Sequence, residues 1–135
     1  MLYTLEISTT KRDEMKEITE EVRALVRKSG IQHGIAVVYC PHTTAGIAIN
    51  ENADPDVKHD VLLRLDEVYP WNHPKYRHIE GNTASHLKAI TTGTSQTIII
   101  HNGSLVLGRW QGIYFCEFDG PRMRQCHVKI IKTES

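Results

Sequence analysis

The chain has 135 residues and a mass of 15.4 kDa, which suits one domain with its own hydrophobic core and is too short for two ordinary ones. Sixteen basic side chains balance sixteen acidic ones, so the formal net charge is zero and no overall field attracts nucleic acid or an anionic membrane surface. We therefore expect a single domain over residues 1–135 without a nucleic-acid partner. A local anion pocket is compatible with this composition.

The cysteine pattern and the apolar runs bear on the cellular compartment. Cys40, Cys116 and Cys126 are odd in number, form no C-x-x-C and lie in or beside apolar runs, which argues against the disulfide framework of a secreted protein. No apolar run approaches the ~20 residues that cross a bilayer, and the N-terminus lacks the regions of a signal peptide. We expect a soluble, cytoplasmic protein with no membrane partner.

The first quarter of the chain predicts a strand followed by a helix. Leu2 to Ser8 alternates apolar and polar side chains, as a half-buried strand does. Thr10 or Asp13 can cap a helix that ends at Gly30. The apolar residues of this helix recur at helical spacing: Met15, Ile18, Val22, Leu25 and Val26.

The next segment predicts two strands and a second helix. The apolar run 34–40 is typical of a strand buried on both faces, and residues 47–50 predict another strand. Asp54 as N-cap and Pro55 at the first helical position mark a helix start. The apolar stripe of that helix, with Asp60 at its border, consists of Val57, Val61, Leu65 and Val68.

The remaining chain predicts a loop, a short helix and a strand-rich C-terminal third. Residues 69–81 contain two prolines and no period, so we expect a loop, followed by a short helix that Asn82 can cap. Asn102-Gly103 is a strong signal for a tight hairpin turn. The predicted strands of this third are 97–101, 104–107, 114–118 and 126–132.

Polar side chains are concentrated where the buried strand 34–40 ends. His42, Asn50, Glu51, Asp54 and Asp60 follow an apolar strand directly, although polar groups cost free energy wherever they are buried without partners. We interpret this stretch as the floor and rim of a site.

Histidines and carboxylates in the same region suggest a divalent metal. His42, His78 and His86 can supply imidazole ligands to Zn²⁺, with Glu51 or Asp60 completing the set. Their spacing matches no zinc signature, and histidines that cap turns or bond to carbonyls are the alternative. The oxygens of residues 50–56 suit Mg²⁺ held together with substrate phosphates, or equally turn and cap chemistry.

Charged residues of the C-terminal strands add a candidate phosphate contact. Period two places Gln111, Glu117 and Asp119 on one face of a strand unless a bulge intervenes. Arg122 can bind a phosphate through two donors, or it can neutralise the nearby carboxylates as an internal ion pair.

Four stretches of the chain carry a resemblance to a known family: PHTTAGIAINENADPDV, DEVYPW, HIEGNTASHLKA and GSLVLGRWQGIYFCEFDGPR. On these motifs the chain resembles the YjbQ-like proteins over nearly its whole length. The resemblance implies a compact single-domain α+β fold, mainly antiparallel sheet with two or three helices, assembled as a homotrimer with sites near the subunit boundaries. It also implies a polar cluster of His42, Asn50, Glu51, Asp60, His78, His86, Gln111, Glu117 and Arg122.

The resemblance further implies a secondary thiamine phosphate synthase activity, which joins a pyrimidine methyl diphosphate to a thiazole phosphate. For this reaction we expect Glu51, Asp60 and His42 to be catalytic, with a divalent metal. The phosphate-containing substrate is expected to meet Asn50, Trp110, Gln111, Glu117 and Arg122.

Two alternatives remain open at this point. One is metal-assisted hydrolysis, with His42, His78 and His86 on Zn²⁺ and Glu51 as general base. The other is a non-catalytic trimeric module that binds a small anion.

Overall fold

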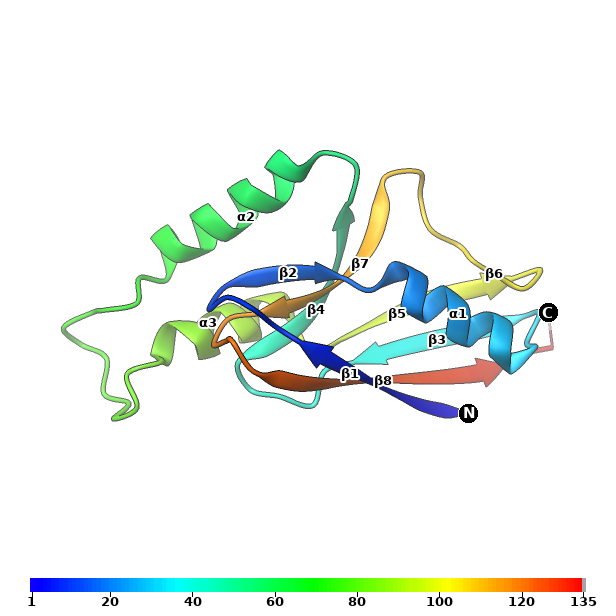
Figure 1. The fold of residues 1–135 in the computed structure, drawn as a ribbon, viewed down its shortest axis with the longest axis horizontal. Helices are drawn as coiled ribbons and strands as arrows, with labels where there is room; N and C mark the ends of the chain where they lie inside the picture. Colours follow the sequence, from blue (N-terminus) through cyan, green and yellow to red (C-terminus); the bar gives the residue numbers. More distant parts are fainter. Residues whose placement is uncertain (135) are drawn as a thin grey trace.

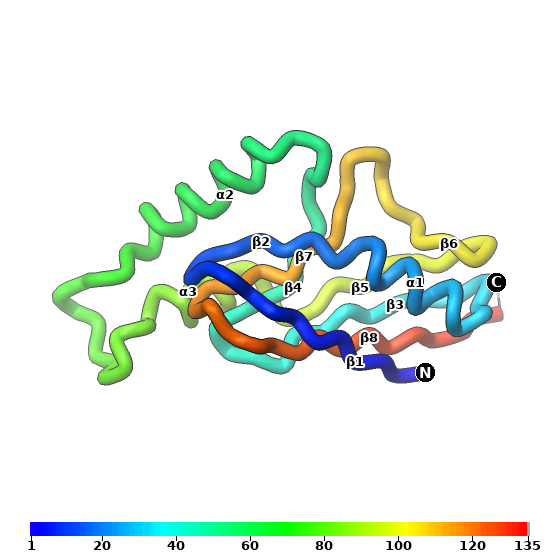
Figure 2. The backbone as a smooth tube through the Cα atoms, in the orientation of Figure 1, coloured from blue at the N-terminus to red at the C-terminus, as the bar shows by residue number. Residues whose placement is uncertain are grey.

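The computed structural model describes residues 1–134, which form eight strands and three helices (Figures 1 and 2). The helices are α1 (Thr19–Ser29), α2 (Pro55–Val68) and α3 (Thr83–Thr92). The strands are β1 (Leu2–Ser8), β2 (Glu14–Glu17), β3 (Gly34–Tyr39), β4 (Ala45–Glu51), β5 (Ser95–His101), β6 (Ser104–Leu105), β7 (Gln111–Glu117) and β8 (Met123–Lys132).

The strands form two antiparallel sheets. One has five strands in the order β1-β8-β3-β5-β6, and the other has three in the order β2-β7-β4. Figure 1 shows α1 and both termini at one end of the molecule and α2 and α3 at the other. The structure therefore confirms a single-domain α+β fold of mainly antiparallel sheet with three helices. No helix within residues 1–134 has the length and apolar character needed to span a membrane.

Two apolar clusters hold the layers together. The larger one lies between the sheets and combines one face of the five-stranded sheet with α1 and the facing side of the three-stranded sheet; it includes Val22, Val26, Ala36, Val38, Ile47, Ile98, Ile100, Phe115, Val128 and Ile130. The smaller one lies on the opposite side of the three-stranded sheet, where Tyr114 and Cys116 pack with Ala89 of α3 and Leu62 of α2. The three-stranded sheet is thus apolar on both faces.

The predicted start of the first helix is wrong. Residues 14–17 form β2, which pairs with β7 so that Met15 lies opposite Cys116, and the helix begins only at Thr19. Pairing with β7 and burial of Met15 outweigh the helical spacing of the apolar residues, because tertiary contacts override local preference. Neither Thr10 nor Asp13 caps this helix, whose N-cap is Ile18.

Other local predictions are confirmed. Asp54 caps α2 by accepting a hydrogen bond from the Asp56 amide at 2.9 Å. Asn102 and Gly103 both have positive φ, as the predicted tight turn requires. The strand over residues 34–40 was predicted to be buried on both faces, and only one face is. Ile35 and Val37, on the other face of β3, are half-buried within one chain.

A buried lysine of α3 connects α2 to the rest of the molecule through an ion pair. No residue of α2 is fully buried, so this helix has few apolar anchors. Lys88 of α3, which is only 1% exposed, places its Nζ 3.0 Å from a carboxylate oxygen of Asp13 and 3.0 Å from one of Asp66. Arg12 reinforces this cluster through Asp66 at 3.3 Å and by lying over the Trp71 ring.

Removing this lysine should therefore destabilise the fold. We expect Lys88→Ala to lower the free energy of unfolding by about 2–4 kcal/mol, because two carboxylates lose their partner and a cavity forms. Lys88→Met fills the cavity and should cost less, whereas Lys75→Ala in the exposed loop should change little. Urea denaturation measures all three. A cost for Lys88→Ala no larger than that for Lys75→Ala would contradict the role assigned to this cluster.

Candidate functional site

A hollow of about 420 Å³ lies between the segment that follows β3, the start of α3 and the turn between β7 and β8. Its polar wall contains three histidines, two arginines, two carboxylates and an amide: His42, His78, His86, Arg122, Arg124, Glu80, Asp119 and Asn82. Residues separated by more than 80 positions in the chain thus meet at one surface.

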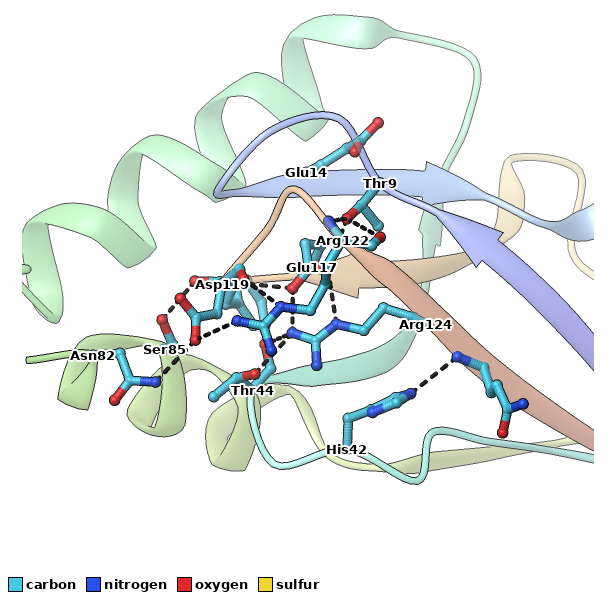
Figure 3. A network of polar contacts seen from close by, with 12 residues as sticks. Thr9, Glu14, His42, Thr44, Asn82, Ser85, Glu117, Asp119, Arg122 and Arg124 are labelled. Atoms are coloured by element: carbon cyan, nitrogen blue, oxygen red, sulfur yellow. Dashed lines mark hydrogen bonds and ion pairs between the residues drawn. The ribbon is translucent and has the colours of Figure 1, made fainter. Parts of the chain in front are cut away.

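A buried ion pair forms the back of this hollow (Figure 3). The Glu117 side chain is fully buried, and Arg124, which is 4% exposed, donates from Nε to Glu117 Oε1 at 2.8 Å and from Nη2 to Oε2. The Thr9 hydroxyl and the Asp119 amide also bond to this carboxylate, each at 2.9 Å. Burial raises the pKa of Glu117, but these hydrogen bonds outweigh it and hold the pKa below the ordinary carboxyl value.

The same arrangement leaves one nitrogen of Arg124 free. Nη2 also donates to Thr44 Oγ1 at 2.8 Å, so two of the three guanidinium nitrogens are engaged. Within residues 1–134 no group accepts a hydrogen bond from Nη1, and Figure 3 shows this nitrogen on the side of Thr44 and His42. Arg124 lines the hollow, so Nη1 can donate to a ligand there.

Arg122 provides a second guanidinium at the same wall. Its Nε donates to the Asp119 carbonyl at 2.9 Å and its Nη2 to Asp119 Oδ2 at 3.1 Å. The Asn82 amide donates to the same oxygen at 2.9 Å, which ties the start of α3 to the β7–β8 turn. Arg122 is about half exposed, so it faces both the hollow and solvent.

His42 is held as a neutral hydrogen-bond donor. Its Nε2 accepts a hydrogen bond from the Gln125 amide at 3.0 Å, so a neutral ring carries its proton on Nδ1. Burial lowers the pKa of His42, and the positive charge of Arg124 lowers it further. In this arrangement neither ring nitrogen offers a free lone pair to a metal.

The other two histidines lie side by side. The rings of His78 and His86 meet edge to face with centroids 5.3 Å apart, and His78 Nε2 is 3.9 Å from Glu80 Oε1. Across residues 1–134 no set of three or more His, Cys, Asp or Glu side chains is placed to hold a metal ion. The predicted three-histidine zinc site therefore does not fit this geometry.

A second, mainly apolar hollow adjoins the first. It has a volume of about 430 Å³, shares His42, Thr43 and His86 with the polar hollow, and is lined further by Ala89 and Ile90 of α3. The two hollows together offer a charged compartment beside an apolar one.

Four of the predicted site residues lie away from this hollow. Strands β4 and β7 pair over their whole length, with Ala45 opposite Glu117 at the end near the hollow. Glu51 lies opposite Gln111 at the other end. These two residues are therefore six positions from the Ala45–Glu117 pair, which is about 20 Å along the strands. Asn50 and Trp110 adjoin that distant end. Here the side chains of Asn50, Glu51 and Gln111 each accept a hydrogen bond from a nearby backbone amide.

Two further predicted residues do not face the hollow either. Asp60 is exposed on α2, and among the described residues its side chain hydrogen-bonds only to its neighbour His59, at 2.9 Å. Glu117 lies behind Arg124 with both carboxylate oxygens engaged, so it positions that arginine instead of meeting a ligand. Of the predicted set, the structure brings four residues together at the hollow: His42, His78, His86 and Arg122.

The sequence interpretation missed Arg124 and Asn82. Arg124 shares strand parity with Cys126, Val128 and Ile130, all of which are buried, so alternation placed an arginine on the inner face of a strand. That pattern was a usable signal, since a buried arginine requires a partner. Asn82 was interpreted as a helix cap, yet its side chain makes no capping hydrogen bond and bonds to Asp119.

The tautomer of His42 generates a pH prediction. A group whose pKa is lower in the folded than in the unfolded state stabilises the fold above its unfolded pKa, and this contribution is lost as the pH falls. We expect the stability contributed by His42 to decline below about pH 6.5, its ordinary value. His42→Gln keeps an acceptor for the Gln125 amide but does not titrate.

Urea denaturation at pH 7.5 and pH 5.0 tests this expectation. The loss of stability between the two pH values should be smaller in His42→Gln than in the wild type, and unchanged in His73→Gln, an exposed control. Equal losses in the wild type and His42→Gln would show that His42 titrates normally.

Comparison with known proteins gives a consistent result. The profile of the family described as UPF0047 protein YjbQ-like matches residues 3–133. The UPF0047 protein YugU of Bacillus subtilis is 65% identical over 97% of this chain and 99% of its own length. A UPF0047 protein of Methanocaldococcus jannaschii is 52% identical over 97% of this chain and 94% of its own.

Solved structures agree with this assignment. A YjbQ/UPF0047 protein of Clostridium acetobutylicum superposes with a TM-score of 0.94 at 55% identity, covering 96% of this chain and 99% of that one. A YbjQ-like protein of Sulfolobus solfataricus superposes with a TM-score of 0.94 at 32% identity, covering 98% and 97%. None of these relatives has a name that states an activity. The chain belongs to the YjbQ-like UPF0047 family.

Proposed function

We propose that the protein binds a phosphate-bearing small molecule in the polar hollow and promotes departure of a phosphate or diphosphate group from it. The observation that carries this proposal is Arg124, a buried arginine with two nitrogens fixed by Glu117 and Thr44 and the third directed to the hollow. Rigid donors placed where negative charge develops stabilise a transition state without reorganising.

Two other groups support an anionic ligand. Arg122 lines the same wall, and His42 carries its proton on Nδ1 and lines the same hollow. Hydrogen bonds from guanidinium groups to phosphate oxygens are charge-assisted and strong. Glu117 offsets the charge of Arg124 from behind, so the arginine tolerates burial before any ligand arrives.

The specific reaction that we propose to test is the joining of a pyrimidine methyl diphosphate to a thiazole phosphate. In that reaction the thiazole nitrogen forms a bond to the methylene carbon while the carbon–oxygen bond to diphosphate breaks. Arg122 and Arg124 would carry the charge of the leaving diphosphate. The apolar hollow beside His42 and His86 would bind the pyrimidine ring of the substrate. Trp110 of the same chain cannot bind this ring, because it lies next to Gln111 at the distant end of β7.

A divalent metal enters this proposal only together with the substrate. Mg²⁺ needs one or two carboxylates plus substrate phosphates, and Glu80 and Asp119 are the carboxylates on the wall of the hollow.

Hydrolysis of a phosphate ester is the second candidate. The observation in its favour is the His78–His86 pair with Glu80 beside it, because imidazoles next to an anion site can transfer protons to and from water.

Calorimetric titration with phosphate and diphosphate tests the anion site. We expect Arg122→Gln and Arg124→Gln each to weaken binding by at least about tenfold, since each removes a charged donor. Arg23→Gln, on α1 at the opposite end, is the control. Melting temperatures check that Arg124→Gln still folds, and Arg122→Gln, whose side chain is half exposed, is the safer variant. Absence of binding to the wild type would refute the proposal.

Turnover assays then separate the candidate functions. Incubation with both thiamine precursors should release diphosphate only when the thiazole phosphate is present. Release without the thiazole would favour hydrolysis, and tight binding without release would identify an anion-binding module.

We also propose that the chain assembles as a homotrimer through the outer face of its five-stranded sheet. Ile35 of β3 pairs in register with Ile99 of β5 on one side and Ile131 of β8 on the other, which forms an apolar row. Ile99 is 59% exposed and Ile131 is 42% exposed, and within residues 1–134 none of the helices α1 to α3 packs on this face. An exposed apolar row on a sheet is typical of a surface that another subunit covers.

Light scattering after size-exclusion chromatography tests the assembly. The wild type should have three times the 15.4 kDa chain mass. Ile99→Glu should shift the protein toward the monomer, because it places a charge in the apolar row. Leu63→Glu, a similarly exposed position on α2, should keep the trimer. A monomeric wild type would contradict the proposal.

A further inference from the structure

Two polar atoms beside the candidate site are buried without a partner. Among the described residues 1–134, nothing donates a hydrogen bond to Asn82 Oδ1, and Thr83 Oγ1 is likewise unpaired. Asn82 is only 8% exposed and lines the polar hollow. Thr83 lines a smaller hollow of about 220 Å³ together with His78 and His86, which also border the main one. Buried unpaired acceptors cost free energy and are rare in folded proteins.

The orientation of the Asn82 amide is fixed. Its Nδ2 donates to Asp119 Oδ2 at 2.9 Å, and because a carboxylate can only accept, the amide cannot turn over to present Nδ2 instead of Oδ1. Arg122 donates to the same Asp119 oxygen at 3.1 Å, so the Asn82 amide lies within about 6 Å of the Arg122 guanidinium. Figure 3 shows Oδ1, the acceptor of the same amide, on the side turned away from Asp119. The Asn82 amide thus lies next to the arginine wall through Nδ2 and presents its acceptor beyond that wall, at the start of α3.

We infer that the ligand carries a hydroxyl or amino donor close to its phosphate, and that Asn82 Oδ1, assisted by Thr83 Oγ1, accepts from it. This inference rests on the proposed function and narrows the class of ligand. The phosphate meets the donor side of the hollow, formed by Arg122, Arg124 and His42. The hydroxyl or amino group meets the acceptor side at the start of α3. A site that pairs with a ligand donor discriminates strongly against an analogue that lacks it.

Two ligands of similar length test the inference on the wild type alone. Glycerol 3-phosphate carries a hydroxyl two carbons from the ester oxygen, whereas propyl phosphate has the same chain without hydroxyls. Calorimetric titration should give about tenfold tighter binding for glycerol 3-phosphate, the effect of one added hydrogen bond. Equal affinities would overturn the inference but leave the anion site intact. If neither ligand binds, the proposed function itself fails.

Two variants then locate the acceptor. Leucine is similar to asparagine in size and shape but offers no acceptor. Asn82→Leu should therefore bind both ligands with the affinity that the wild type has for propyl phosphate. Thr83→Val removes only the unpaired hydroxyl, so it should reduce the preference partway without lowering the melting temperature. A preference that survives both substitutions in full would overturn the assignment. The comparison on the wild type keeps the inference testable if Asn82→Leu does not fold.

Discussion

The candidate site depends on one buried ion pair, between Glu117 and Arg124. Taking both charges out of water is costly, and a pair of well-packed apolar residues often stabilises a fold equally well or better. Here the pair joins four segments, because Thr9 at the end of β1, Thr44 before β4 and the Asp119 amide also bond to it. What an apolar pair would not supply is a rigid donor at the hollow, which Arg124 Nη1 provides (Figure 3).

The rest of the fold holds segments around that pair. Ser85 of α3 donates to the Phe118 carbonyl at 2.6 Å, and Asn82 bonds to Asp119, so the start of α3 is fixed to the β7–β8 turn. Lys88, further along α3, connects the same helix to α2 through Asp66. The loop between α2 and α3 carries His78 and Glu80 to the hollow. The arginines and Asn82 are thus held by hydrogen bonds between β8, the β7–β8 turn and the start of α3. The histidine pair has one member on α3, His86, and one in the loop that precedes it, His78.

The sequence predicted most elements because their signals are local: an Asp-Pro helix start, an Asn-Gly turn and alternating strands. It failed at Met15, where helical spacing competed with strand pairing to a segment 100 residues away. The site was predicted in part. His42, His78, His86 and Arg122 do meet, but Asn50 and Glu51, which follow His42 by eight and nine positions, lie at the far end of β4. Strand alternation does place Arg124 on an inner face, but its partner Thr44 and the partner of Asn82, Asp119, are far away in the sequence, so no local motif reveals what these two side chains bind.

Nuclear magnetic resonance of the arginine side chains tests the central claim most directly. In protein labelled with ¹⁵N, the guanidinium signals can be followed during titration with phosphate, with Arg124→Lys used to assign the Arg124 signals. The Arg124 resonances should shift saturably and more than those of Arg23 and Arg27, which lie on α1. Saturable shifts confined to other arginines, with the Arg124 signals unmoved, would show that the buried ion pair does not serve an anion site.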